Sequence, residues 1–252
     1  MEKKQKQELY SVLILLFVFL FSVSFPFSLI FDNAITIYIC SISIRIAFLV
    51  FAFIFINKES LPSFKFKKID WKLILFFPLF AGCFSNFIYC YFDQAEMLNI
   101  FSWSTFGQNA ALIFLSVLSE EIVFRVVIYA EFARKYRKIL AVIFSSLIFG
   151  SLHILNINSL PSIPYCLVQS LYASALGLVV GLLYAYSDNF VLPFIYHLLF
   201  NICNDELSTS LFNIEWNKTF YVTNILVVII LLAYGLLIYF FVLKKEEELD
   251  AA

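Results

Sequence analysis

About eight apolar runs, each close to the length of a bilayer-spanning helix, constrain the fold of this chain more than any other feature. A span needs about 20 mostly apolar residues, which places the spans at residues 10–31, 34–56, 72–92, 108–131, 139–155, 165–186, 190–204 and 219–243. We therefore expect an all-α, polytopic membrane helix bundle, in which protein rather than lipid shields the short fifth and seventh spans. The first run exceeds the apolar core of a signal peptide and lacks a cleavage site, so it reads as a retained span.

The composition excludes several classes of protein. The chain is 62% hydrophobic and 14% charged, whereas a soluble domain is nearer half apolar and a quarter charged. The net charge of −1 means that the chain lacks the excess of positive charge typical of nucleic-acid-binding proteins. The five cysteines show no metal-ligand spacing, and we interpret them as small buried apolar residues. We expect a lipid bilayer as the environment and no nucleic-acid partner.

The positions of lysine and arginine predict the topology. With eight spans and both termini in the cytoplasm, four basic clusters fall on the cytoplasmic side; they comprise Lys3, Lys4 and Lys6, then Lys58, Lys65, Lys67, Lys68 and Lys72, then Arg134, Lys135, Arg137 and Lys138, and finally Lys244 and Lys245. Only Lys218 falls outside, and an odd number of spans would break this segregation. The short loops favour a bacterial plasma membrane.

The chain divides into three parts along its length. Residues 1–106 supply three N-terminal spans, residues 107–204 form a catalytic helix core, and residues 205–252 hold the last span and a cytoplasmic tail. A charged side chain at mid-bilayer costs about 2.5–3.5 kcal/mol, so the ionisable residues inside the spans are functional candidates. These candidates are Glu120, Glu121 and Arg125 in the fourth span, His153 in the fifth, and His197 with Asn201 in the seventh.

Helical geometry separates the two adjacent glutamates. Glu121 and Arg125 are four residues apart, with the acid on the N-terminal side, which is the better order for an ion pair. Glu120 points about 100° away from Glu121, since a helix has 3.6 residues per turn. We interpret Glu121 and Arg125 as a structural pair and Glu120 as a carboxylate free to act as a general base.

The histidines supply the rest of a candidate site. His197 and Asn201 share one helix face, and Phe149 and His153 share another. Water activated by Glu120 and His153, with His197 and Asn201 donating to the carbonyl oxygen, would hydrolyse an amide. Alternatively, Glu120, His153 and His197 hold a divalent ion such as zinc, although the HExxH helix motif is absent. The cofactor is therefore either none or a divalent metal.

Each of these residues also has a structural interpretation. A membrane histidine or asparagine can simply hydrogen-bond a neighbouring helix. Gly177 and Gly181 form a small-xxx-small step that predicts close helix packing. Arg45 has no acid at helical spacing in its own span, and we assign it no function. What favours a site is the joint occurrence of both histidines and the acid pair in separate apolar spans.

With these motifs the sequence resembles the CAAX protease and bacteriocin-processing family, also called CPBP or Abi. The resemblance covers about residues 107–204 and rests on three motifs in order: Glu120-Glu121-x-x-x-Arg125, Phe149-x-x-x-His153 and His197-x-x-x-Asn201. It implies that Glu120 and His153 activate water and that His197 and Asn201 stabilise the oxyanion. Both metal-dependent and metal-independent glutamate mechanisms are attributed to the family. It further implies membrane-associated or prenylated-type peptide substrates and, among bacterial members, self-immunity to bacteriocins.

The main hypothesis is thus an intramembrane endopeptidase acting on a peptide or membrane protein. One alternative is a non-enzymatic immunity or scaffold protein that binds a partner within the membrane. A transporter with a carboxylate proton relay is a third, disfavoured by the absence of inverted halves in the sequence.

Overall fold

The computed structural model describes residues 2–58, 61–62, 64–68, 71–98, 100–158, 163–240 and 244, and these residues are almost entirely helical. Pairing of the strand type within these ranges is limited to two isolated bridges, Phe66 with Asn189 and Met97 with Phe212. The expected all-α class therefore holds for the described chain. Lys245 and the rest of the predicted cytoplasmic tail lie outside the described residues.

The helices follow the predicted spans in order. The α-helices are α1 (Glu2–Ser24), α2 (Ala34–Lys58), α3 (Ser85–Asp93), α4 (Trp103–Glu121), α5 (Ala130–Ala133), α6 (Lys138–Leu152), α7 (Ile163–Ser187), α8 (Val191–Leu199), α9 (Ser208–Leu211) and α10 (Lys218–Ile238). Between them lie the 3₁₀ segments η1 (Phe27–Leu29), η2 (Trp71–Phe84) and η4 (His153–Asn158), and the π-helical segments η3 (Ile122–Tyr129) and η5 (Phe200–Leu207).

Five described helices are long and apolar enough to cross a membrane. They cover Lys6–Ser24, Ala34–Lys58, Lys138–Leu155, Ile163–Ser187 and Lys218–Ile238. The other three predicted spans are each divided among shorter elements: η2 with α3, α4 with η3 and α5, and α8 with η5 and α9. Several apolar spans thus support a multi-pass membrane protein, while the count of eight stays a prediction.

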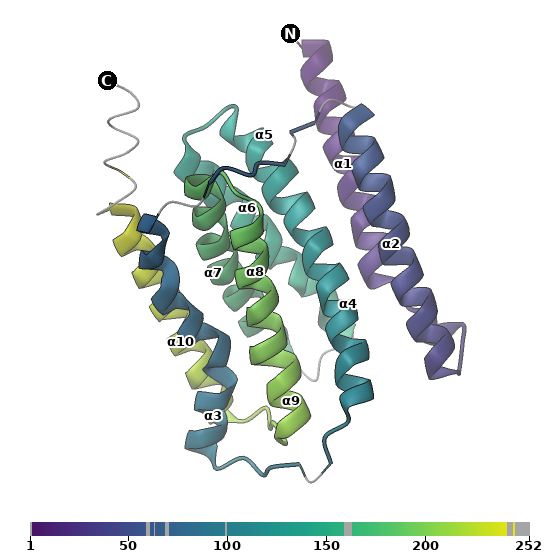
Figure 1. Ribbon diagram of the computed structural model, residues 1–252, viewed down its shortest axis with the longest axis vertical. Helices are drawn as coiled ribbons and strands as arrows, with labels where there is room; N and C mark the ends of the chain where they lie inside the picture. Colours follow the sequence, from purple (N-terminus) through teal and green to yellow (C-terminus); the bar gives the residue numbers. More distant parts are fainter. Residues whose placement is uncertain are drawn as a thin grey trace.

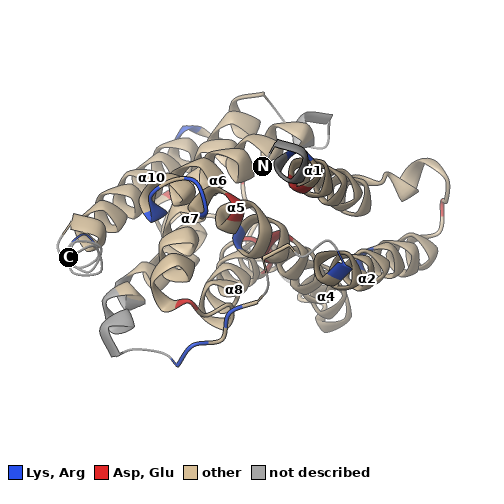
Figure 2. Ribbon diagram, turned by 90° about the horizontal axis from the view of Figure 1, so that it is seen from above, with Lys and Arg blue, Asp and Glu red and all other residues tan. Residues whose placement is uncertain are grey.

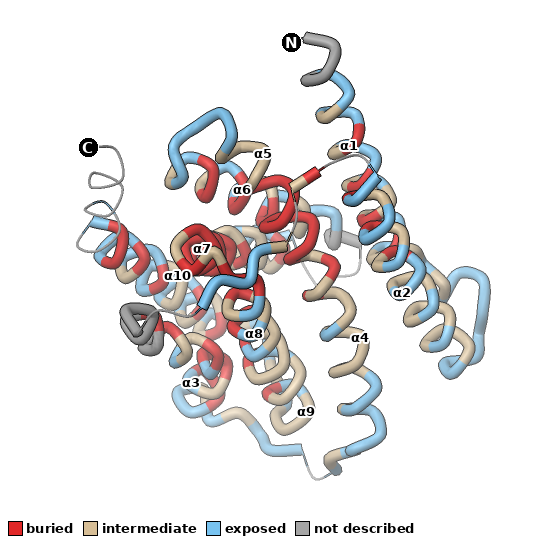
Figure 3. Tube along the Cα trace, turned by 45° about the horizontal axis from the view of Figure 1, so that its top comes forward, coloured by how far each residue is buried: buried red, intermediate tan, exposed pale blue. Residues whose placement is uncertain are grey.

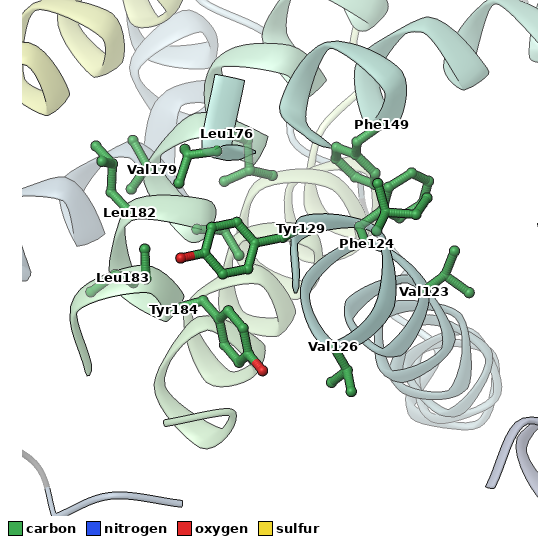
Figure 4. Packing of buried hydrophobic residues seen from close by; sticks show 14 of the residues in the cluster. Val123, Phe124, Val126, Tyr129, Phe149, Leu176, Val179, Leu182, Leu183 and Tyr184 are labelled. Carbon is green, nitrogen blue, oxygen red and sulfur yellow. The ribbon is translucent and has the colours of Figure 1, made fainter. Parts of the chain in front are cut away.

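The core of the bundle is built around α7. This helix packs against α6, α8 and α10, whereas α1 and α2 form a pair at one flank and α3 lies beside α10 at the other (Figure 1). Buried positions concentrate in α6, α7 and η3, and α2 is largely exposed (Figure 3). Tyr129 of η3 meets Tyr184 of α7 edge-on, with ring centroids 5.5 Å apart (Figure 4). The exposed apolar side chains of the outer helices form the surface that a bilayer would solvate.

The start of α1 and the end of α10 lie at the same end of the bundle (Figure 1). Several described members of the predicted basic clusters occur there, and Figure 2 views the molecule from that end. Arg134 Nη1 lies 3.9 Å from Oε1 of Glu8 in α1. The ammonium groups of Lys65 and Lys67 both contact the carboxylate of Asp188, which follows α7. Which side of a membrane this end faces stays a prediction.

The seventh span is longer than the sequence indicates. We expected it to end at residue 204, before two consecutive polar residues, but the helix continues through η5 and α9 to Leu211. Asn204 is 1% exposed and accepts hydrogen bonds from the Ser85 hydroxyl and the Asn86 backbone, at 2.7 and 2.8 Å. Because a neighbouring helix satisfies its side chain, this residue continues the helix instead of ending it.

The predicted small-residue step on α7 does pack closely against α6. A Cβ added at Gly177 would lie 3.1 Å from the Phe149 ring, and one at Gly181 would lie 2.9 Å from Val142. Gly150 faces α7 still more tightly, because its added Cβ would lie 1.8 Å from Ser174 Oγ and 2.6 Å from the Ser170 carbonyl oxygen. Close backbone approach between these helices therefore depends on glycine.

We predict that Gly150→Ala destabilises the protein by about 1–3 kcal/mol, since the backbone oxygen of Ser170 cannot turn away as a side chain can. Thermal unfolding of the purified variant measures the effect. Gly107→Ala is the matched control, because nothing lies within 4 Å of its added Cβ. An unchanged melting temperature for Gly150→Ala would contradict the close packing of α6 and α7.

Residues 64–68 are hydrogen-bonded to the turn between α7 and α8. Backbone hydrogen bonds join Lys67 to Asp188 and Phe190 to Lys65, at 3.1 and 2.8 Å. Partial burial opposes ionisation of Asp188, but hydrogen bonds from Lys65 and Lys67 outweigh it and lower the pKa of this carboxyl below its ordinary value. Asp188 has a φ of 44°, a left-handed conformation that aspartate and asparagine both tolerate.

Asp188→Asn is therefore expected to remove the charge while preserving the backbone. A lowered pKa stabilises the fold above the ordinary pKa of aspartate, and the contribution disappears as pH falls through the lowered value. Both lysines are exposed, so we expect a loss of at most about 1 kcal/mol at pH 7. Unfolding measured at pH 7 and near pH 3 should show the difference between parent and variant shrink on acidification; a constant difference would contradict it.

Candidate active site

A fully buried ion pair lies where α4 becomes η3. Arg125 Nε donates to Glu121 Oε2 at 3.2 Å, and both side chains are 0% exposed. Arg125 Nη1 also donates to Ser145 Oγ of α6 at 3.4 Å, and that hydroxyl donates to the Phe124 carbonyl at 2.8 Å. The predicted contact between Glu121 and Arg125 is present, and it fixes α4 and η3 against α6.

Glu121 has a second partner that the sequence did not indicate. Its Oε1 lies 2.8 Å from Nδ1 of His197, which comes from α8 and is 2% exposed. A carboxylate can only accept, so Nδ1 carries the hydrogen in this contact. Glu121 therefore orients the imidazole of His197 while it balances Arg125, as a buried carboxylate does behind a catalytic histidine.

Glu120 is the open member of the acid pair. Its side chain is 18% exposed, against 0% for Glu121, and its Oε2 lies 3.6 Å from Nε2 of His197. That separation is longer than a direct hydrogen bond, so the two groups are neighbours and are not directly bonded. The two glutamates thus contact opposite nitrogens of one imidazole and differ in access.

A cavity with about 380 Å³ of empty space brings Glu120 and His153 together. Residues from three elements form the rest of its wall: Phe19, Leu20, Val23 and Ser24 from α1, Phe124 from η3, and Phe149 and Leu152 from α6. His153 Nδ1 lies 3.1 Å from the Phe149 carbonyl oxygen, which only accepts, so this nitrogen donates. In the neutral ring the other nitrogen, Nε2, then keeps its lone pair.

The ring of Phe149 lies next to Arg125, His153 and His197. The Arg125 guanidinium carbon lies 5.3 Å from the ring centroid, and the rings of His153 and His197 lie 5.0 and 5.6 Å away. This contact is a cation–π arrangement that holds the guanidinium against an apolar wall. Phe149 therefore contacts several groups of the site, and its ring centroid also lies 5.0 Å from that of Phe124 (Figure 4).

Asn201 is not joined to this group. Its side chain makes no hydrogen bond to another residue in the described ranges, and it does not line the cavity of Glu120. The helix changes from α to π winding at Phe200, one residue before it.

The described side chains do not fit the proposed zinc set. Within the described ranges no three His, Cys, Asp or Glu side chains gather closely enough to hold a metal ion together. Both ring nitrogens of His197 face carboxylates, and Nδ1 of His153 faces a carbonyl oxygen. The surroundings of Glu120, His153 and His197 instead suit proton transfer and hydrogen bonding.

The sequence analysis did not predict two contributions to the site, one from Arg45 and one from α1. The guanidinium of Arg45 in α2 lies close enough to Glu120 for their charges to interact, and it donates to Ser116 Oγ of α4 at 2.9 Å. It also donates to the Val23 carbonyl of α1 at 3.3 Å. The sequence held one signal for Arg45, which is an arginine in an apolar span with no acid at helical spacing. The wall contributed by α1 had no comparable signal.

A comparison with known families matches the part of the chain that holds these motifs. The family model described as type II CAAX prenyl endopeptidase Rce1-like matches residues 102–203, a range that includes every predicted site residue from Glu120 to Asn201. No curated protein and no solved structure matches the chain. This part of the chain is therefore similar to a CAAX-type protease domain. Residues 102–203 match the model of an Rce1-like domain of the CAAX protease, or CPBP, family.

Proposed function

We propose that this chain is an intramembrane endopeptidase in which Glu120 activates the attacking water. The proposal rests on the contrast between the two glutamates. Glu121 is paired with Arg125 and His197, whereas Glu120 lines a cavity together with His153. A general base must reach a water molecule in a place that a peptide carbonyl can also occupy.

The proposed reaction transfers protons through Glu120. Glu120 accepts a proton from water as the water oxygen attacks the carbonyl carbon, and His153 Nε2 accepts a hydrogen bond from the same water. As the tetrahedral intermediate collapses, the carbon–nitrogen bond breaks and the departing amine takes the proton from Glu120. The products are a new carboxylate and a free amine.

His197 and Asn201 are the proposed donors to the oxyanion. His197 Nδ1–H donates to Glu121, so Nε2 can donate to an oxyanion only when the ring is the cationic imidazolium. The buried carboxylate of Glu121 would balance that positive charge. Asn201 would have to turn toward the substrate to contribute the second donor. Both roles rest on the family resemblance together with the position of His197 beside Glu120.

Asn201→Ala is expected to lower kcat by about 10²-fold with little change in stability, since removal of one oxyanion donor costs about 10²–10³ in rate. The absence of a hydrogen bond from its side chain to other described residues explains why stability should be retained. Turnover and thermal unfolding of the same preparation test both statements. A normal kcat would remove Asn201 from the proposed site.

The wall of the cavity favours an apolar substrate segment. Phe19, Leu20 and Val23 of α1 face Glu120 and His153 across it. An extended peptide near a lipid anchor or at the end of a membrane helix would present both a carbonyl group and apolar side chains to this wall. We therefore propose membrane-associated or prenylated-type peptides as the substrate class.

Proteoliposomes holding the purified chain test this function. A peptide with a prenylated C-terminal cysteine, the same peptide without the lipid, and a transmembrane peptide would be incubated separately, and products mapped by mass spectrometry. Cleavage of a lipid-anchored or transmembrane peptide is expected. Absence of cleavage together with saturable peptide binding would favour a scaffold or immunity protein. Parallel samples with chelator, and with zinc added back, determine whether activity needs a metal.

A further inference from the structure

A second cavity lies away from Glu120, at the end of the bundle where α10 begins. It has about 460 Å³ of empty space, and its lining comes from α3, α7, α9, α10, η5 and the segment before α10. None of the proposed catalytic residues lines it. Its chemistry differs from that of the first cavity, because it combines one carboxylate, several carboxamides and a set of aromatic rings.

The carboxylate belongs to Asp205 of η5, whose side chain is exposed. It accepts hydrogen bonds from neutral groups, the Tyr172 hydroxyl at 3.4 Å and Asn204 Nδ2 at 3.3 Å. No Lys, Arg or His of the described chain lies within ion-pair distance of Asp205, and none lines the cavity. A carboxylate placed in this way attracts a cation.

Aromatic side chains form the facing wall. The ring of Trp216 lies 4.2 Å from that of Tyr165 and 4.9 Å from that of Phe220, measured between centroids. All three residues line the cavity. The faces of such rings carry negative potential and attract organic cations, so the wall and the carboxylate select the same charge.

Asn86 of α3 adds a hydrogen-bond acceptor. Its side chain is 6% exposed and lines the cavity, and Nδ2 donates to the Asn204 carbonyl at 2.8 Å, which fixes the orientation of the amide. The other amide atom, Oδ1, is buried and has no donor among the described residues. An unpaired buried acceptor is costly, so a ligand that brings an N–H group would stabilise this wall.

We propose that this cavity binds a primary ammonium group. Such a group carries the positive charge that Asp205 and the rings select, and its N–H donors match the Asp205 carboxylate and Asn86 Oδ1. A quaternary ammonium satisfies the charge but offers no N–H, and an anion satisfies neither. The ammonium can come from a phosphatidylethanolamine headgroup or from a free small amine. This proposal does not depend on the peptidase activity.

The test uses full-length protein in detergent, with Trp71→Phe and Trp103→Phe so that Trp216 alone reports. Ethylammonium chloride is titrated at constant ionic strength, and tetramethylammonium chloride is the comparison cation. We expect a saturable change in Trp216 fluorescence with ethylammonium and a clearly weaker one with tetramethylammonium. Asp205→Asn should weaken ethylammonium binding by about tenfold or more, because a charge-assisted hydrogen bond is lost.

Glu206→Gln is the matched control, since it removes a neighbouring charge that does not line the cavity and whose Oε1 accepts from Asn109 and Ser210, and it should weaken ethylammonium binding far less than Asp205→Asn does. Nanodiscs with phosphatidylethanolamine or phosphatidylcholine, each mixed with phosphatidylglycerol, distinguish the sources. Competition only by phosphatidylethanolamine assigns the headgroup, and an unaltered titration assigns a free amine. A non-saturable response of the parent, or equal binding of both cations, overturns the proposal even if Asp205→Asn fails to fold.

Discussion

Glu120→Gln is expected to lower kcat/KM for peptide cleavage by about 10³-fold, within the range of 10²–10⁴ typical of a lost general base. Glutamine keeps the size and the hydrogen-bonding capacity of the side chain but cannot take a proton from water. Because Glu120 is partly open and forms no ion pair with Arg125, the fold should be retained. Initial rates in proteoliposomes, together with a melting curve for each preparation, measure both effects.

The control for this variant is Glu206→Gln, the same chemical change at a carboxylate outside the cavity of Glu120. It should retain the parent rate. Equal turnover by the parent and Glu120→Gln would reject Glu120 as the base. Equal loss in both glutamine variants would indicate that charge anywhere in the bundle matters, rather than the position of Glu120.

Arg125→Met is expected to destabilise the protein by about 3–5 kcal/mol, the range for removing one partner of a buried ion pair. The variant leaves Glu121 fully buried without its guanidinium, and it removes the hydrogen bond to Ser145. Methionine preserves much of the volume, so most of the loss is electrostatic. The free energy of unfolding in mixed micelles, measured against denaturing detergent, is the relevant quantity.

The double variant Glu121→Gln/Arg125→Met separates charge from packing. With both charges removed, much of the lost stability should return, because no uncompensated ion remains buried. Glutamine can still accept from His197 Nδ1, but it cannot balance an imidazolium, so activity should stay low. If the double variant were no more stable than Arg125→Met, the contribution of Glu121 to stability would not be that of a buried ion-pair partner.

Local spacing predicted those parts of the structure that depend on one helix. Apolar runs of suitable length gave the order of helices, and the four-residue separation predicted the contact between Glu121 and Arg125. Gly177 and Gly181 predicted close packing for the same reason, since both lie on one face of α7. These features require no knowledge of how distant segments meet.

Contacts between distant segments could not be read from spacing. Glu121 and His197 are separated by 76 positions, and only the packing of α8 beside α4 brings them within 2.8 Å. The α1 wall and the approach of Arg45 to Glu120 arise in the same way. The π winding of η5 was not predicted, because the sequence analysis assumed 3.6 residues per turn throughout.

The most direct test of the central claim follows the oxygen of water into the product. Parent and Glu120→Gln proteoliposomes would cleave a membrane-anchored peptide in H₂¹⁸O, and mass spectrometry would locate the label. We expect one ¹⁸O atom in the new carboxylate released by the parent and almost no product from Glu120→Gln. Labelled product formed at the parent rate by Glu120→Gln would contradict it.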